Sequence, residues 1–327
     1  MAVQQRKSGN KKKSVDVKEE SSNAANSGKR ELSQSQKIQG DASGFKMPWT
    51  KIASRFLLSM LMIFAVYWTS KKDTMHVFAS QKQRLQLTSA EVSCSSDYLK
   101  DVSKFKACAP KHCGRLVTDI VITPEEAAHL LRVAKKGLAF GGSYGGASIL
   151  DLHSGALSYE NSFINIYQKL KALDKNIFTA DDFKVYRNVR NKIQQIIAYN
   201  FGINANKLHL THPTFFSEMT PRAAKTKHDE YWHVHVDKET YPSFHYTSLL
   251  YLADYGADFT GGRFIFVDEV KNMTIEPRVG RVSAFTSGAE NPHFVEPVSS
   301  GTRYALTVSF SCDPDFGIAD PNIEKLK

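Results

Sequence analysis

The residues best suited to chemistry gather in one stretch, 228–237, and at two later positions. His235 and Asp237 form a His-x-Asp pair in that stretch. On an extended backbone, residues two apart point to the same face, so this imidazole and carboxylate could bind one metal ion from adjacent positions. Such a pair is common by chance. It gains weight because His293 follows as a distal histidine and Arg303 lies ten residues further on.

Two imidazoles and one carboxylate suit an iron(II) site. Three protein ligands on one face leave open positions opposite, where dioxygen and an anionic co-substrate can bind together. Arg303 lies in an alternating run, 302–308, in which residues 303, 305 and 307 share one face. A guanidinium there can bind a distal carboxylate through two parallel hydrogen bonds. The four residues therefore predict a site for iron(II) and a dicarboxylic co-substrate.

The elements that must position this site are short strands. From Lys207 onward, apolar and polar residues alternate in short runs, most of them separated by Gly, Pro, Asp or Asn. About eight short strands at this spacing are typical of a jelly roll, in which two antiparallel sheets leave an open mouth between them. The predicted strands cover residues 208–210, 214–217, 232–237, 244–252, 263–267, 273–276, 281–285, 294–298 and 302–310.

This pattern resembles the 2-oxoglutarate- and iron-dependent dioxygenases, in their prolyl 4-hydroxylase-like branch. The resemblance is carried by His235-x-Asp237, His293 and Arg303. It implies that the first three residues bind Fe(II) and that Arg303 binds 2-oxoglutarate. It further implies O2 as the oxidant, often L-ascorbate to rescue oxidised iron, and release of succinate and CO2 as a C–H bond is hydroxylated.

The resemblance covers about residues 205–312 and implies a double-stranded β-helix. Residues 246–254 resemble the branch's strand before its Gly-Gly-x-Phe turn, here 261–264. Within that strand, Tyr251 matches a position where the branch has a co-substrate-binding tyrosine; a packed aromatic of the sheet is the alternative. Collagen-type enzymes of the branch carry Lys where this chain has Arg303. Because Arg occurs there in other members, the expected co-substrate is unchanged.

His233 also lies on the face shared by His235 and Asp237, so a cupin-type His233-x-His235 pair is an alternative. We prefer the His-x-Asp pair because a carboxylate two residues after the histidine matches the family, and we expect His233 to line the entrance. Residues 228–230 are expected to be solvated or to surround the ligands. The remaining histidines of the folded part lack ligand spacing and are expected to be structural or on the surface: His112, His129, His153, His209, His212 and His245.

A β run at 116–122 leads into the first of two predicted helices. Thr123 is a good N-cap, Pro124 suits the first helical position, and Glu126 completes a capping box. We expect this helix to end at Gly137, because glycine is a common helix stop.

A second capped helix is predicted from Thr179 to about Asn200, with Gly202 as its stop. Its apolar residues recur at helical spacing and form one stripe, which we expect to pack against the sheet. The glycine-rich run 141–146 lacks the Gly-Lys-Ser/Thr ending of a phosphate loop, so we expect a mobile loop near a substrate entrance or a plain linker. Helices that buttress one face of a β-rich half define an α+β fold.

Residues 52–70 are predicted to form a transmembrane signal-anchor. The apolar core, 56–68, is interrupted only by Ser59, and a spanning helix needs ~20 residues. The long polar tail ahead of this run and the absence of a clear small-residue cleavage site disfavour a cleaved signal peptide. A buried core helix is a second alternative, disfavoured by the polar sequence on both sides.

The charge distribution predicts the orientation of this anchor. The formal net charge is +10; residues 1–55 hold twelve Lys/Arg and five Asp/Glu, and residues 73–327 are close to neutral. The positive-inside rule then keeps a disordered tail in the cytosol and sends the rest into the ER/Golgi lumen, as a single-pass type II membrane protein. A nearly neutral folded part argues against nucleic acid as a partner.

Four cysteines and a sequon agree with a luminal location. Cys94, Cys108, Cys113 and Cys312 all follow the anchor, where disulfides are expected, with three possible pairings. Asn272 begins an Asn-Met-Thr glycosylation sequon, which is used only in the secretory pathway.

These expectations divide the chain into six segments and suggest a function. The resemblance implies hydroxylation of a protein or peptide side chain, of prolyl type, in the secretory lumen. The alternative is a catalytically inactive β-helix that binds a glycan or protein partner; the intact set of four site residues argues against it. The segments are a disordered basic cytosolic tail (1–51), a transmembrane signal-anchor in the lipid bilayer (52–70), a cysteine-bearing neck (71–114), a helical buttress region (115–205), the Fe(II)/2-oxoglutarate dioxygenase domain (206–315) and a C-terminal tail (316–327).

Overall fold

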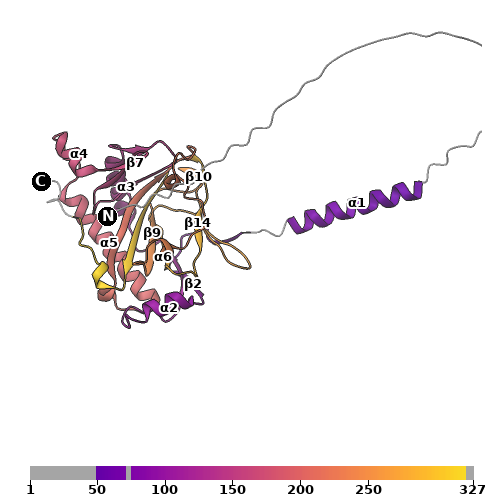
Figure 1. Cartoon of the computed structure of the whole chain (residues 1–327), viewed down its shortest axis with the longest axis horizontal. Coiled ribbons are helices and arrows are strands. Elements are labelled where there is room, and N and C mark those ends of the chain that lie inside the picture. Colours follow the sequence, from indigo (N-terminus) through magenta and orange to yellow (C-terminus); the bar gives the residue numbers. More distant parts are fainter. Residues whose placement is uncertain (1–48, 71–74, 322–327) are drawn as a thin grey trace, which may run out of the picture. The chain divides into compact units, whose positions relative to one another are not determined.

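The structure is a computed structural model of the chain, and it describes residues 49–70 and 75–321 (Figure 1). The predicted disordered tail up to residue 48, the start of the neck (71–74) and the last part of the C-terminal tail (322–327) lie outside the described residues.

Helix α1 (Trp49–Ser70) covers the stretch in which the signal-anchor is predicted. Its segment Trp49–Tyr67 is long and apolar enough to cross a membrane, by length and composition, and its large apolar side chains are exposed. Among the residues that the structure describes, it is the one helix of this kind. The chain divides into two compact units between residues 64 and 65, so α1 and the β-rich remainder are each described by themselves.

A sheet of ten strands forms the larger part of the second unit. In order across this sheet the strands are β2 (Thr88–Val92), β3 (Cys113–Thr118), β13 (Val282–Thr286), β9 (Tyr246–Tyr251), β16 (Arg303–Ser311), β8 (His209–Met219), β5 (Ala147–Leu150), β6 (Ala156–Glu160) and β4 (Gly142–Ser143), with β7 (Ser162–Asn165) paired to β6. The β4–β6 pair is parallel and the other neighbours are antiparallel. Antiparallel pairing dominates, as the short alternating runs predict.

A smaller sheet shares an apolar core with the large one. Its four strands are β1 (His76–Ala79), β12 (Met273–Ile275), β11 (Phe264–Phe266) and β14 (His293–Val295). A separate two-stranded ribbon consists of β10 (Phe259–Gly261) and β15 (Val298–Gly301). The shared core contains Val117, Leu249, Tyr251, Phe285 and Ala305 from the large sheet and Phe264, Phe266, Ile275 and Val295 from the small one.

Helices cover the other face of the large sheet (Figure 1). Helices α3 (Pro124–Leu138) and α5 (Ala180–Phe201) pack together, and their apolar residues form a second core with β3, β9, β13 and β16. The predicted packing of the apolar stripe against a sheet is therefore confirmed. The shorter described helices are α2 (Ser96–Val102), α4 (Ile166–Ala172), α6 (Asp237–Thr240) and the 3-10 turns η1 (Ala205–Lys207), η2 (Lys227–Asp229) and η3 (Pro314–Phe316).

Both long helices begin at the predicted caps. Thr123 and Glu126 form a capping box at the start of α3, and Thr179 forms a second one with Asp182 at the start of α5. Gly202 ends α5 with φ 65°, a left-handed conformation that glycine adopts without the steric penalty of a side chain.

The predicted stop at Gly137 is wrong, because α3 continues to Leu138 and is capped by Ala139. Gly137 is buried, and a Cβ atom there would collide with the Leu150 side chain of β5. The glycine is therefore needed for close packing of the helix on the sheet rather than for a left-handed turn.

The predicted strand at 232–237 is also wrong. His235 makes an isolated antiparallel bridge with His293, through reciprocal N–H···O=C hydrogen bonds of 3.0 Å. The chain then enters α6 at Asp237, whose carbonyl accepts a hydrogen bond from the Tyr241 N–H. Because a helical turn follows the bridge directly, a strand ladder cannot continue.

Three other predicted β boundaries differ from the structure. The predicted strand 294–298 is divided between β14 and β15, which belong to different sheets. The predicted strands 208–210 and 214–217 belong to one strand, β8. The run 116–122 is β-structured only as far as Thr118. At the next position the Asp119 carboxylate accepts hydrogen bonds from other segments, and the chain leaves the sheet.

The described part of the neck is built into both sheets, since β1 pairs with β12 and β2 pairs with β3. Of the three possible cysteine pairings, the structure forms Cys94–Cys113 and Cys108–Cys312. The second disulfide joins the neck to the residue after β16, 204 positions away. The neck is thus tied to the strands that carry the candidate site.

Candidate active site

The bridge between residues 235 and 293 brings three potential metal ligands together. His235, Asp237 and His293 each offer one ligand atom, and these atoms lie within 4.8 Å of one another. Nε2 of each histidine lies 3.6 Å from Oδ1 of Asp237. A helical turn and a strand that are distant in the sequence therefore present the predicted ligand set at one point.

The hydrogen bonds of both imidazoles leave Nε2 facing the carboxylate. Nδ1 of His235 lies 2.9 Å from the carbonyl oxygen of His233, and Nδ1 of His293 lies 2.9 Å from that of Asn291. A carbonyl oxygen can only accept, so Nδ1 carries the proton in each ring and Nε2 keeps its lone pair. This is the tautomer that a metal ligand needs.

The second carboxylate oxygen of Asp237 is held by the large sheet. The Thr247 hydroxyl of β9 donates to Oδ2 over 2.6 Å and lies 2.9 Å from the Ser287 hydroxyl. These bonds orient the carboxylate and leave Oδ1 on the side of the imidazoles. Such supporting contacts are typical of metal-binding carboxylates.

The two imidazoles differ in their exposure. His293 is buried against Phe264 and Phe285, with ring centroids 5.0 Å and 4.8 Å away. Burial lowers the pKa of His293, which favours its neutral form. The His235 side chain is 42% exposed. The ligand group therefore lies at the boundary between the apolar core and solvent.

Arg303, the first residue of β16, is buried deeper in the same cavity. Its Nε donates to the Gly262 carbonyl over 2.9 Å, and its Nη1 lies 3.6 Å from the Met219 sulfur. Its Nη2 has no hydrogen-bond partner among the described residues. Burial lowers the pKa of Arg303 from its ordinary value, since a cation without a full set of partners is unfavourable in an apolar core.

Two tyrosines lie near this guanidinium. The ring centroid of Tyr251 is 5.5 Å from Cζ of Arg303, and its hydroxyl lies 3.1 Å from the Ser283 hydroxyl within the buried core. Tyr231, which the sequence interpretation did not select, lines the cavity, and its hydroxyl accepts a hydrogen bond from the Val298 N–H at 3.0 Å. Its place within the stretch 228–237 is the signal that could have identified it.

The ligand group and Arg303 line one cavity of about 410 Å³. Its mouth is formed by the segment before the His-x-Asp pair and by the turn after it. The mouth residues are Lys227, Glu230, His233, Thr240 and Tyr241, and the wall also includes Phe215, Met219, Tyr231, Phe244, Leu249, Phe264 and Val295.

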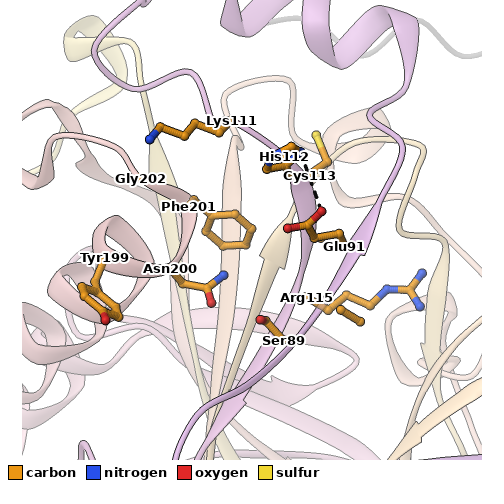
Figure 2. Close-up of a pocket in the computed structure, with 12 residues that line it drawn as sticks. Ser89, Glu91, Lys111, His112, Cys113, Arg115, Tyr199, Asn200, Phe201 and Gly202 are labelled. Atoms are coloured by element: carbon orange, nitrogen blue, oxygen red, sulfur yellow. Dashed lines mark ion pairs between the residues drawn. The ribbon is translucent and has the colours of Figure 1, made fainter.

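A second cavity, of about 240 Å³, lies between the end of α5 and strands β2 and β3 (Figure 2). Lys111, His112 and Tyr199 are exposed at its edge, and His112 lies 3.8 Å from the Glu91 carboxylate. It contains none of the four residues that the sequence predicts for metal and co-substrate binding.

The residues before the His-x-Asp pair are fixed by a buried carboxylate. Asp229 accepts hydrogen bonds from the Ser143 hydroxyl and from the Thr226 N–H and hydroxyl. The glycine-rich run 141–146 thus contacts the segment that leads to the mouth, and a Cβ at Gly145 would collide with Asp229. His233 lies 2.9 Å from the Glu230 carboxylate, and both residues line the cavity.

Other predicted positions lie outside the cavity. His129 pairs with Asp182 at 2.7 Å, and His153 lies 2.8 Å from the Tyr186 hydroxyl, so both join structural elements. Asn272 is partly exposed in the turn before β12, and its Oδ1 accepts a hydrogen bond from the Asp268 N–H at 3.2 Å.

The sequence around this cavity matches known proteins. A family model described as the 2OG-Fe(II) oxygenase superfamily matches residues 221–311, which contain the ligand group and Arg303. The mouse protein "2-oxoglutarate and iron-dependent oxygenase domain-containing protein 3" is 53% identical over 276 residues, which are 84% of this chain and 87% of the relative. The chain belongs to the 2OG-Fe(II) oxygenase superfamily. It is a 2-oxoglutarate-dependent dioxygenase, and its family uses Fe(II) and 2-oxoglutarate.

The chain is also similar, at lower identity, to proteins named as prolyl hydroxylases. Prolyl 3-hydroxylase 2 of Gallus gallus is 29% identical over 221 residues, which are 61% of this chain and 30% of that protein. A solved prolyl hydroxylase of Trichoplax adhaerens, in complex with a hypoxia inducible factor peptide fragment, aligns with 67% of this chain and 94% of its own, at 15% identity and a TM-score of 0.40.

Proposed function

We propose that this dioxygenase hydroxylates a prolyl-type side chain of a protein or peptide in the secretory lumen. The observation that carries the co-substrate assignment is the unpartnered Nη2 of buried Arg303 in the cavity of the ligand group. A buried guanidinium donor without an acceptor is unfavourable, and a carboxylate of 2-oxoglutarate would satisfy it through a charge-assisted hydrogen bond.

The ligand group fits Fe(II). His235 and His293 would supply neutral Nε2 atoms and Asp237 would supply Oδ1, a set of two imidazoles and one carboxylate with further positions open. When bound, iron(II) would supply the redox chemistry that couples decarboxylation of 2-oxoglutarate to hydroxylation. One oxygen atom of O2 enters succinate and the other enters the new C–OH group, with CO2 as the second product.

The chain's own side chains bind the co-substrate, orient the ligand carboxylate and exclude water. Arg303 holds the distal carboxylate of the co-substrate, and Thr247 keeps the Asp237 carboxylate directed toward the imidazoles. Phe264 and Phe285 cover the His293 imidazole and keep water from that side of the site. Because the Tyr251 ring lies against the Arg303 guanidinium, we assign Tyr251 the role of holding that group in place.

The two facing sheets support a double-stranded β-helix, which we place at 206–315 with a helical buttress at 115–205. We propose L-ascorbate as the reductant that returns oxidised iron to Fe(II). The more distant relatives named as prolyl hydroxylases support a prolyl-type substrate.

The luminal location is supported by three features. Helix α1 suits a signal-anchor at 52–70 by length and composition, behind a basic tail at 1–51. The four cysteines form two disulfides. Asn272 lies partly exposed in a turn, where a glycan can be accommodated. We propose a single-pass type II topology with Asn272 glycosylated.

The activity is tested by measuring succinate release by the full-length protein with Fe(II), 2-oxoglutarate, ascorbate and extracted luminal proteins. We expect release by the wild type and its loss, by at least about a thousandfold, in Asp237→Ala, because removal of one ligand disrupts the metal site. Mn(II) with 2-oxoglutarate should raise the melting temperature of the wild type. No rise and no succinate would leave the alternative of an inactive binding module.

The location is tested by gel mobility. Treatment of the cell-expressed protein with a glycosidase should shift its band, and Asn272→Gln should remove that shift. An unshifted wild-type band would contradict glycosylation at Asn272.

A further inference from the structure

The turn that follows α6 carries two stacked aromatic rings that line the cavity, of which the outer one lies at its mouth. Tyr241 and Phe244 have ring centroids 4.9 Å apart and an interplanar angle of 25°. Phe244 is 2% exposed and Tyr241 is 40% exposed, and both line the cavity. Phe244 therefore backs one face of the Tyr241 ring, and the outer ring is available to a bound molecule. We name this pair the aromatic shelf.

The backbone of the aromatic shelf is tied to a ligand residue. The Tyr241 N–H donates to the Asp237 carbonyl over 2.8 Å, and the Phe244 N–H donates to the Tyr241 carbonyl over 2.9 Å. These hydrogen bonds fix the position of the shelf relative to Asp237 as long as the turn keeps its conformation. The shelf and the reacting centre form one local structure.

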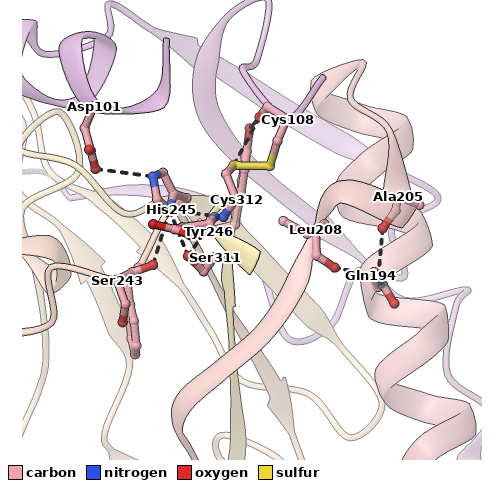
Figure 3. Close-up of a disulfide and its surroundings, with 12 residues drawn as sticks. Asp101, Cys108, Gln194, Ala205, Leu208, Ser243, His245, Tyr246, Ser311 and Cys312 are labelled. Atoms are coloured by element: carbon pink, nitrogen blue, oxygen red, sulfur yellow. Dashed lines mark hydrogen bonds and ion pairs between the residues drawn. A yellow bond between two sulfur atoms is a disulfide. The ribbon is translucent and has the colours of Figure 1, made fainter. Parts of the chain in front are cut away.

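Lys238, the second residue of α6, holds the same turn through hydrogen bonds to its backbone carbonyls. Its ammonium group lies 2.9 Å from the Pro242 carbonyl, 3.0 Å from the Phe244 carbonyl and 2.6 Å from the Asp101 carboxylate. An ammonium group has three donors, and these three acceptors use all of them. Asp101 comes from α2 of the neck, where it also lies 3.3 Å from His245 (Figure 3).

We propose that the Tyr241 ring is the surface on which the substrate's prolyl ring packs, and that Lys238 is the positioning residue that holds this ring beside the metal site. This inference rests on the proposed function and adds the residues that select the substrate. Aromatic side chains are the usual surface against which prolyl rings dock, because a flat, apolar ring covers an aromatic face without a loss of hydrogen bonds.

The charges around the mouth favour a prolyl over a lysyl side chain. An aromatic ring also attracts cations. However, Lys227 is exposed at the mouth of the same cavity, where it repels a second cation. The one carboxylate in the mouth segment that lines the cavity, Glu230, is paired with His233. A neutral ring therefore fits this mouth better than an ammonium group does.

The test compares two simple probes, deca-proline and deca-lysine, on the full-length protein loaded with Mn(II) and 2-oxoglutarate without O2. We expect deca-proline to bind more tightly than deca-lysine, by calorimetry. Tyr241→Ala should weaken deca-proline binding about tenfold and Tyr241→Phe by less than about twofold, because only the first removes the ring. Tyr199→Ala, which changes a tyrosine exposed at the edge of the second cavity, is the matched control and should bind as the wild type does.

The role of Lys238 is tested by kinetics. Lys238→Met keeps the aliphatic stem and removes the three donors, so it should raise the KM for deca-proline about tenfold with a much smaller change in kcat. Lys238→Arg should bring the KM most of the way back to the wild-type value, because it again donates to the turn. A fall in kcat as large as the rise in KM, which Lys238→Arg does not reverse, would show a merely structural role and overturn the positioning assignment.

The outcomes separate this inference from the proposed function. If the wild type releases succinate but deca-lysine binds better, or Tyr241→Ala binds deca-proline as the wild type does, the shelf assignment is overturned and the dioxygenase function stands. If the wild type fails to release succinate with every substrate extract, the proposed function fails first. Melting temperatures of the variants within a few degrees of the wild type exclude misfolding as the cause.

Discussion

Arg281 and Arg303 are both fully buried, yet they are surrounded very differently. Arg281, directly before β13, donates to both oxygens of Asp119 at 2.8 Å. Its remaining donors are taken by the carbonyl oxygens of Ala79, Ser80, Gln83 and Glu276. Arg303, on β16, has one carbonyl acceptor, one sulfur contact and an unpartnered Nη2 among the described residues.

The difference separates a structural arginine from one that is built for a ligand. A buried charge is tolerated when every donor is satisfied, and Arg281 meets that condition while joining the neck to the large sheet. Arg303 does not meet it, although it lies in the same fold. A protein retains such an incomplete site when a bound anion completes it. Burial and residue type alone would not have distinguished the two.

The largest effect is expected from Arg281→Met. It leaves the buried Asp119 carboxylate without its partner, so the free energy of unfolding should fall by about 3–5 kcal/mol. Urea denaturation of the full-length protein measures this. A loss no larger than that of Arg303→Met would remove the distinction between the two arginines.

Arg303→Met should act on binding rather than on folding. We expect the Kd for 2-oxoglutarate to rise roughly a hundredfold, since a charge-assisted pair is lost. The melting temperature should stay equal or rise, because an unsatisfied buried cation is removed. Calorimetry and thermal unfolding give both values. Arg303→Lys keeps the charge but not the planar pair of N–H donors. Its Kd for 2-oxoglutarate should lie between those of the wild type and Arg303→Met.

Lys238 is a half-buried cation, satisfied like Arg281 but adjacent to the site like Arg303. Its neighbour His245 gives the cluster a pH dependence. Burial, and then the Lys238 charge, lower the pKa of His245 to about 4. Between pH 6.5 and 4 the His245 imidazole binds a proton in the unfolded chain but not in the folded chain. Stability should therefore decline as pH falls through this range, by about 3 kcal/mol.

The measurement is urea unfolding across that pH range, and His245→Gln should flatten the decline. The contribution of Asp101 to stability is lost at a lower pH than that of His245. Partial burial raises its pKa, but hydrogen bonds from Lys104 and Lys238 outweigh this and lower it to about 2. That contribution should therefore be present above the ordinary carboxyl pKa and be lost only as pH falls toward 2. An undiminished slope in His245→Gln would contradict the assignment of the higher range.

The smallest effect is expected from Thr247→Val, which removes the hydroxyl that orients Asp237 and preserves the shape of the side chain. Metal affinity should fall about tenfold, as is usual for partners of a ligand. Titration with Mn(II) measures it. Ser248→Ala, which changes a neighbouring buried hydroxyl that donates to Val308 of β16, is the control and should keep wild-type metal affinity.

The sequence predicted the site residues better than their backbone. His235 and Asp237 could be paired from spacing, but they are joined by a bridge and a helical turn, not by a strand. Spacing indicates that two side chains share a side, and both conformations allow that. His293 and Arg303 were placed by resemblance, since their proximity depends on strand pairings that no local pattern contains.

Helix starts were predictable, and the roles of the two helix-end glycines were predictable only for Gly202. The two capping boxes follow from local hydrogen bonding that the sequence displays directly. Gly137 and Gly202 look alike in the sequence, but one permits close contact with Leu150 and the other permits a left-handed turn. Lys238 and Tyr231 were missed for the same reason, because their partners come from distant segments.

The place of Thr274 sets the time at which its neighbour can be modified. Thr274 is fully buried in β12, paired with Val77 of β1 on one side and Ile265 of β11 on the other. An enzyme that recognises Asn-x-Thr must reach this threonine as well as Asn272, so it has to act on the nascent polypeptide before β12 is enclosed. The fraction of molecules glycosylated at Asn272 would therefore depend on the rate of glycan transfer relative to the rate at which β12 pairs with its neighbours. This fraction should increase in variants whose sheet forms more slowly.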